Sequence, residues 1–130
     1  MADSLHIRKV TKTFSPTNTQ VNQSTRLFTA HTGEIPVRTV ARVLVGSNMG
    51  VPLVKLGDAG STNRLLTAAQ IDVANTGLKT GAGANDLAAC GHYVYTSNTA
   101  VNVGYNSNTV GALTNPCKVR FTVWLLDADT

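Results

Sequence analysis

The strongest hydrophobic pattern in this chain has a period of two and begins at residue 37. Apolar or small side chains recur at every second position over residues 37–45, with two arginines between them. The same alternation returns over residues 119–126, where arginine, threonine and tryptophan stand between the apolar residues of the inward face. Alternation of this kind is typical of a strand with one face buried. Both segments are therefore predicted to be strands.

Shorter segments between these two also predict strands separated by turns. Residues 93–96 and 100–105 are predicted to pair as a hairpin around a turn at 97–99. Residues 51–56 form a short strand that includes Pro52, which cannot donate to a ladder, so this strand is expected at a sheet edge. Turns are expected at 46–50 and 57–63, a loop at 80–86, and one helical turn within 64–73.

The strand over residues 119–126 has apolar residues on both faces near its end, which predicts a central position in its sheet. Trp124 is then expected to pack outside the main core. The predicted inward side chains are those of the final strand together with three valines from earlier strands: Val119, Phe121, Val123 and Leu125 with Val43, Val101 and Val103.

The first third of the chain reads differently. Residues 11–26 are mostly Thr, Asn, Gln and Ser, with Pro16 among them, and offer little apolar area for a core. We therefore predict one domain over residues 1–130, in which 1–36 form a polar, basic, partly extended arm and 37–130 form the core.

Composition supports an all-β fold. The 130 residues include 18 Thr and 15 Val but a single Glu, Glu34. Branched Cβ atoms suit strands, whereas good helix formers are sparse here. Several short strands about ten residues apart, with Gly, Asn and Thr in the turns, predict an antiparallel β-sandwich of the jelly-roll type with an extended N-terminal arm.

The net charge of +4 is unevenly placed. Residues 1–42 carry six basic and two acidic groups, whereas residues 43–130 carry five of each. Such an imbalance predicts contact with a polyanion or an acidic protein surface, although a solvated polar segment would look the same. The candidate contact residues are the basic groups of that first third: Arg8, Lys9, Lys12, Arg26, Arg38 and Arg42.

Motifs for catalysis or cofactor binding are missing from the sequence. Gly81 and Gly83 fall short of a nucleotide-binding loop, the histidines lack metal-site spacing, and no nucleophile elbow occurs. We expect no enzyme activity, cofactor or metal. No apolar run reaches the roughly 18 residues of a membrane span, and no secretory signal opens the chain, so folding in a cytoplasm with reduced Cys90 and Cys117 is expected.

From residue 37 to 126 the order of segments resembles a family of small virion proteins of tailed bacteriophages. The resemblance rests on a Val-rich strand at 40–45, a segment at 63–73 leading to Gly77 and Leu78, a Gly-x-Tyr-x-Tyr-Thr stretch at 91–96, residues 101–105 and a Val-rich final strand. The sequence departs from that pattern in its polar N-terminal arm and at Pro116 and Cys117. The resemblance implies a β-sandwich head protein that decorates or cements the capsid surface, often as a trimer.

We therefore expect a capsid decoration protein on the virion surface that contacts the major capsid protein and other copies of itself as a trimer. Membrane and nucleic-acid partners are not expected. Within the structural class, a tail or baseplate component, or a small coat protein whose basic face meets nucleic acid, stays open. The alternative of another class is a carbohydrate-binding β-sandwich for host attachment, with Trp124, Tyr93, Tyr95 and Tyr105 as its available aromatic side chains.

Overall fold

The computed structural model describes residues 6–15, 22–46, 53–62, 64–66, 71, 77–80, 93–106 and 117–127. Within these residues the chain forms seven strands, in sequence order: β1 (Ile7–Phe14), β2 (Asn22–Ala30), β3 (Glu34–Val45), β4 (Leu53–Gly57), β5 (Gly77–Thr80), β6 (Thr99–Asn106) and β7 (Lys118–Asp127).

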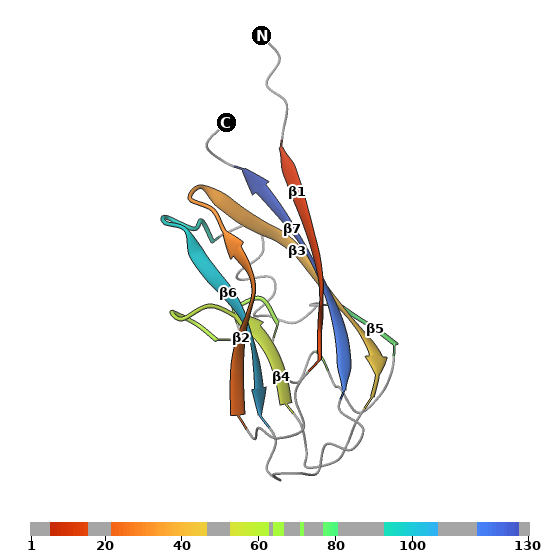
Figure 1. Cartoon of the computed structure of the whole chain (residues 1–130). Helices are drawn as coiled ribbons and strands as arrows, with labels where there is room; N and C mark the ends of the chain where they lie inside the picture. The colour runs from red at the N-terminus through yellow and green to blue at the C-terminus, as the bar shows by residue number, and fades with distance from the viewer. Residues whose placement is uncertain are drawn as a thin grey trace.

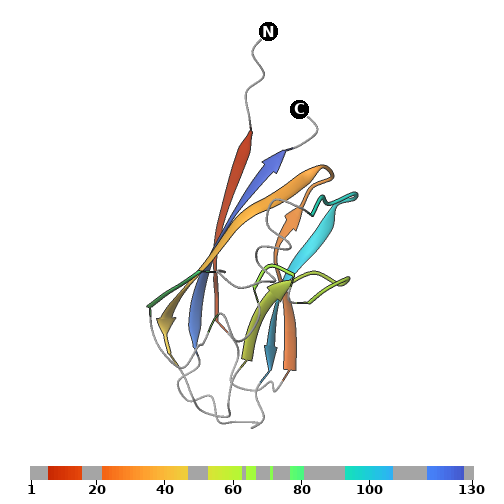
Figure 2. The same ribbon diagram turned by 180° about the vertical axis from the view of Figure 1, so that it is seen from behind.

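The strands make two antiparallel sheets that face each other as two layers (Figure 1). One sheet has four strands in the order β1-β7-β3-β5, and the other has three in the order β2-β6-β4. Figure 2 shows the same two layers from behind. The predicted antiparallel β-sandwich is confirmed.

Strand pairing joins segments that lie far apart in the sequence. The first strand pairs with the last, β2 pairs with β6, and β3 pairs with both β5 and β7. A jelly roll has eight strands in two four-stranded sheets, and the described residues supply seven. The jelly-roll type therefore stays a prediction.

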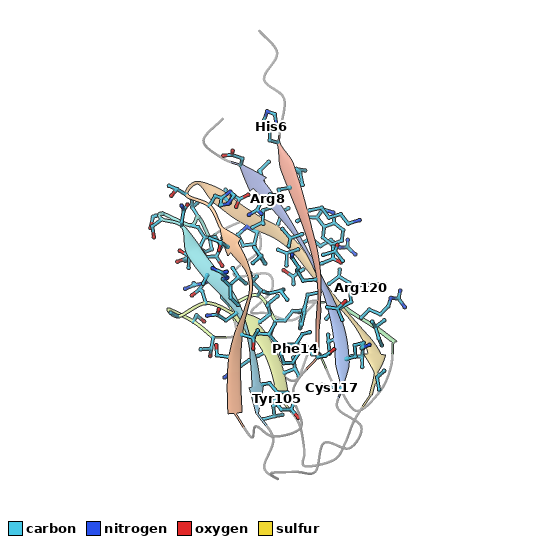
Figure 3. All side chains as sticks on the ribbon, viewed as in Figure 1. His6, Arg8, Phe14, Tyr105, Cys117 and Arg120 are labelled. Atoms are coloured by element: carbon cyan, nitrogen blue, oxygen red, sulfur yellow. The ribbon has the colours of Figure 1, made fainter. Side chains whose placement is uncertain are left out.

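The core lies between the sheets and matches the predicted inward side chains. Val119, Phe121, Val123 and Leu125 have no exposed surface, and Val43, Val101 and Val103 are buried with them. β7 is central, between β1 and β3, as the two-sided pattern indicated. Phe14 and Tyr105 reach from opposite sheets toward each other, with ring centroids 6.1 Å apart (Figure 3).

The predicted boundary at residue 37 is wrong for the described part of the first third. Residues 7–14 form β1 along β7, and residues 22–30 form β2 along β6. Phe14, Phe28 and Ala30 belong to the core cluster. β1 and β2 are both edge strands, and an edge strand needs fewer inward apolar residues, which is why the polar composition concealed them. Removing residues 2–20 would therefore take β1 out of its sheet.

The predicted hairpin over 93–105 is only half correct. β6 forms as expected, with Val101, Val103 and Tyr105 buried, but residues 93–96 are not a strand. Tyr95 instead exchanges backbone hydrogen bonds with the β2–β3 turn, accepting from the Gly33 N–H at 2.7 Å and donating to the Glu34 carbonyl at 2.9 Å. β6 pairs with β2 and β4, which flank it.

The predicted alternation in β3 is confirmed at its centre and broken at its ends. Thr39, Ala41 and Val43 are buried as expected, while Val37 and Val45 are exposed. Register shifts at 36/38 and 43/45 change the side that these two valines face, as β-bulges do.

β4 covers most of the predicted strand at 51–56 and lies at a sheet edge, as expected. The strand β5 was not predicted. The turn at 46–50, the loop at 80–86 and the helical turn within 64–73 lie largely outside the described residues.

Candidate functional site

The six predicted contact residues divide between different surfaces because side chains alternate along strands. In the register with β7, Lys9 is opposite Trp124, and Arg38 is opposite Trp124 from the other side. Arg42 is opposite Arg120. The buried residues of β7 are the intervening ones, so Lys9, Arg38 and Arg42 lie together on the outer face of the four-stranded sheet. Arg8, Lys12 and Arg26 lie elsewhere.

On this outer face, Lys9, Trp124 and Arg38 form one row across β1, β7 and β3, with Trp124 in the middle. The Lys9 Nζ lies 5.8 Å from the centroid of the Trp124 ring, and the Arg38 Cζ lies at the same distance. Both distances fall within the range in which a cation is attracted to an aromatic face. The tryptophan is half-buried, as expected for a residue outside the main core.

A second cationic row lies four residues further along β3 and β7, beyond a row that contains Thr11 and Thr122. Arg42 and Arg120 are direct partners across β3 and β7, and both are exposed. Like charges directly opposite each other destabilise a sheet. In Figure 3 the Arg120 side chain points away from the three-stranded sheet.

We call this outer face the basic platform. It consists of five cations around one aromatic side chain: Lys9, Arg38, Arg42, Lys118 and Arg120 with Trp124. Above the tryptophan row lies a row of three aliphatic residues, Ile7, Leu126 and Ile35, in which Ile7 is 57% exposed.

Carboxylates of the described residues do not lie in these rows. They are Glu34, Asp58 and Asp127. Glu34 and Asp58 are buried, and Asp127 is opposite Glu34 on the inward side of the sheet. The platform therefore has no described counter-charge.

Glu34 is paired with Arg8 at the rim of the sandwich. The Arg8 guanidinium donates to Glu34 at 2.7 and 2.9 Å and to the Thr29 carbonyl at 2.9 Å. The His31 N–H donates to the same carboxylate at 2.6 Å. Burial alone would raise the pKa of Glu34, but these hydrogen bonds and the Arg8 charge together lower it. Arg8 thus ties β1 to the β2–β3 turn, and its charge is already neutralised.

Asp58 is the centre of a second internal network. Arg64 donates to its carboxylate at 2.7 and 3.2 Å, the Tyr95 hydroxyl donates at 3.1 Å, and two backbone N–H groups donate at 3.0 Å. Burial opposes ionisation, but the hydrogen bonds and the Arg64 charge lower the pKa of Asp58 overall. The Arg64 guanidinium lies 3.7 Å from the centroid of the Tyr93 ring. This network fixes the chain after β4.

Lys12 and Arg26 line a groove of about 560 Å³ between the edges of β1 and β2. The groove also contains Arg8 and Lys9, and its apolar lining comes from Val10, Leu27 and Phe28. Lys12 and Arg26 are exposed and separate from the platform.

The sequence reasoning missed Lys118 and Arg120, because they fell in the segment with balanced charge. A signal was nevertheless present. Lys118, Arg120 and Trp124 lie at alternate positions of β7 and so share one face. The other cations of that face come from β1 and β3, which pair with β7 on either side. The neutral balance was misleading because it counts charges along the chain and does not say on which face of a sheet each one lies.

The remaining chemistry is sparse. In the described segments, no group of three His, Cys, Asp or Glu side chains is placed to hold a metal ion. Those segments also contain no helix long and apolar enough to cross a membrane. Cys117 is a buried free thiol, as expected, and burial raises its pKa to about 11. Cys90 lies outside the described residues.

The chain matches no protein-family model, and no curated protein shows significant sequence similarity to it. Solved structures do share its fold. A chain of the cyanophage Pam1 capsid asymmetric unit aligns with 97% of this chain and 88% of its own, at 17% identity and a TM-score of 0.71. A chain of the acidic stable capsid of Helicobacter pylori bacteriophage KHP30 aligns with 92% of this chain and 86% of its own, at 18% identity and a TM-score of 0.64.

A third similar chain comes from the capsid of Ralstonia phage GP4, with 100% of this chain and 88% of that chain covered, 11% identity and a TM-score of 0.59. At these identities the likeness is one of fold. In each comparison the likeness extends over nearly the whole of both aligned chains.

Proposed function

We propose that this chain is a structural, non-enzymatic protein of a bacteriophage virion. The observation that carries the proposal is the shared fold with chains from three phage capsid structures, over at least 92% of this chain and at least 86% of each of the others. A match of near-equal length favours a protein of the same kind rather than a common module inside a larger one.

Within the virion, the proposed role is that of a decoration protein that binds the outer head lattice and stabilises it. Its partners would be the major capsid protein and other copies of the same chain, and its location would be the capsid surface after assembly in the host cytoplasm. An array of copies, each making modest contacts with neighbouring capsid subunits, would stabilise the lattice through multivalency. The platform, which has no carboxylate partner among the described residues, supports a role in surface contact.

The carbohydrate-binding alternative gains no support from the aromatic side chains. Tyr95 and Tyr105 are buried in the core. Tyr93 is covered by the Arg64 guanidinium, and the ring of Trp124 lies between two cations. Sugar recognition uses open aromatic faces, so a stacking platform is not assembled from these residues.

The test is the composition of purified particles. Quantitative mass spectrometry of phage virions should detect the chain at a ratio to the major capsid protein near one, or at a fixed fraction of it. A few copies per particle would instead place the protein in the tail or baseplate. Absence from the particle would refute the virion role altogether.

A further inference from the structure

Resting on the proposed function, we infer that the basic platform is the face that docks on the capsid, and that its partner is an acidic protein surface with an apolar patch. The contact is centred on Trp124, with Arg42 and Arg120 on one side and the aliphatic row of Ile7, Leu126 and Ile35 on the other.

The first argument is the unbalanced charge of the sheet face. Arg42 and Arg120 are direct cross-strand partners on the two central strands of the sheet, and this arrangement is unfavourable in isolation. Elsewhere among the described residues, the partly buried Arg8 and Arg64 each have a carboxylate within 2.7 Å, whereas the exposed Arg26 has none. The platform arginines have none, so an acidic partner would relieve a repulsion that the fold itself leaves in place.

The second argument distinguishes a protein partner from nucleic acid. Phosphate contacts require cations and polar donors, and apolar side chains add nothing to them. The platform instead places exposed aliphatic residues, Ile7 and Val45, in the same sheet face as the arginines. Trp and Arg side chains around an apolar patch are typical of the energetically important centre of protein interfaces.

The third argument is the contrast with the opposite side of the sandwich. On β2, β6 and β4 the polar side carries two cations, Arg26 and Lys55, and Lys55 lies flat across Gly104, with its Cγ and Cε within 3.1 Å of the position of an added Cβ. The described part of that side has no aromatic residue. Charge and aromatic character therefore favour the four-stranded sheet as the docking face.

Two copies cannot use this face to bind each other, since platform against platform brings cations together. The partner is therefore a different protein or a different surface, which fits attachment to a capsid lattice rather than self-association.

Re-binding to particles assembled without the protein tests the inference. The platform variant Arg42→Gln/Arg120→Gln removes two exposed charges, and the control variant Arg26→Gln/Lys55→Gln removes two from the other sheet. The platform variant should bind about tenfold more weakly at low salt and show a flatter salt dependence, since exposed charges are screened as the Debye length shrinks. The control should bind within about twofold of the unaltered protein.

A second variant tests the centre of the contact. Trp124→Thr should also weaken particle binding by at least about tenfold, because truncating a central aromatic residue removes an interface anchor. Circular dichroism and thermal melts of every variant establish that the sandwich is folded. Duplex DNA serves as a parallel ligand in each titration.

The outcomes separate the inference from the function on which it rests. If the unaltered protein binds particles and the platform variants bind equally well, the docking face is wrong while the virion role stands. If the platform variants lose DNA binding but keep particle binding, the face belongs to nucleic acid. If the folded, unaltered protein does not bind particles at all, the decoration role fails and the inference fails with it.

Discussion

Glu34 is the single glutamate of the chain, and it is buried within the sandwich, where Arg8 binds it. Breaking a nearly buried pair leaves a guanidinium without its counter-charge. Because Arg8 is about one-third exposed, water compensates part of the loss. The pair therefore acts mainly to hold β1 against the β2–β3 turn.

We expect Glu34→Gln to lower the free energy of unfolding by about 1–3 kcal/mol near neutral pH. Because the folded pKa of Glu34 lies below its ordinary value of 4.5, its stabilisation is complete above that value and is lost as the pH falls through the folded pKa. The stability difference between the two proteins should therefore shrink on acidification.

Urea unfolding from about pH 7 to about pH 3 measures this change. Asp58, whose pKa is also lowered, is present in both proteins, so its acid dependence cancels in the comparison. A difference that stays constant across the whole range would contradict the assigned role of the Glu34 charge.

Phe121 is the largest buried side chain of the central strand and has no exposed surface. We expect Phe121→Ala to reduce the free energy of unfolding by about 3–5 kcal/mol, through lost transfer energy and the cavity left behind. The neighbouring Thr122 faces outward, so Thr122→Ala should change stability by less than about 0.5 kcal/mol. Reversible denaturant melts measure both, and equal losses would mean that the phase of β7 is wrong.

At the scale of single elements, the turn after β4 depends on a glycine. A Cβ atom on Gly57 would overlap the Ser61 and Thr62 carbonyl groups, which belong to backbone held by the Asp58 network. We expect Gly57→Ala to destabilise the protein by about 1–3 kcal/mol through overpacking.

Gly104 provides the matched comparison. Its Cβ would meet only the flexible Lys55 side chain, so Gly104→Ala should be neutral or stabilising by up to about 1 kcal/mol. Thermal melts of the two variants give the comparison, and a larger loss for Gly104→Ala would show that the turn tolerates movement.

Elements with one face on the core were predictable from sequence, because burial imposes the alternation directly. The final strand and residues 100–105 are the clearest cases. β1 was missed because its inward positions include Arg8 and Lys12, which line an open groove rather than the closed core. The segment at 93–96 was wrongly predicted to be a strand. Tyr95 is buried, but its backbone hydrogen-bonds to the β2–β3 turn and does not take part in a sheet.

Three of the six candidate contact residues fall on one face of one sheet, and the contact role of all six stays a prediction. Lys9, Arg38 and Arg42 share the platform, but their grouping depends on strand register. Register is a long-range property, and a charge count along the chain cannot supply it. The same limitation concealed Lys118 and Arg120.

At the scale of the whole molecule, four strands are at sheet edges: β1, β5, β2 and β4. Natural proteins cover or blunt such edges. We expect a symmetric oligomer, a trimer, in which a neighbouring copy covers the β4 edge, with the platforms turned away from one another. The final strand, which the sequence offered as the alternative edge, is central in its sheet and needs no such cover. Light scattering at micromolar concentration measures the assembly, and raising the salt should not dissociate it. A stable monomer that also fails to order on the particle would contradict this expectation.

The position of β7 has a consequence for synthesis. It follows every other strand in sequence, yet it lies between β1 and β3, with Ile7 opposite Leu126. A nascent chain on the ribosome therefore holds β1 without a sheet partner until β7 emerges, and contacts this distant in sequence form slowly. Trp124, Arg120 and Lys118 arrive with the same strand. Translation products that end before β7 thus lack the completed sheet and two of the five platform cations, Lys118 and Arg120, together with Trp124.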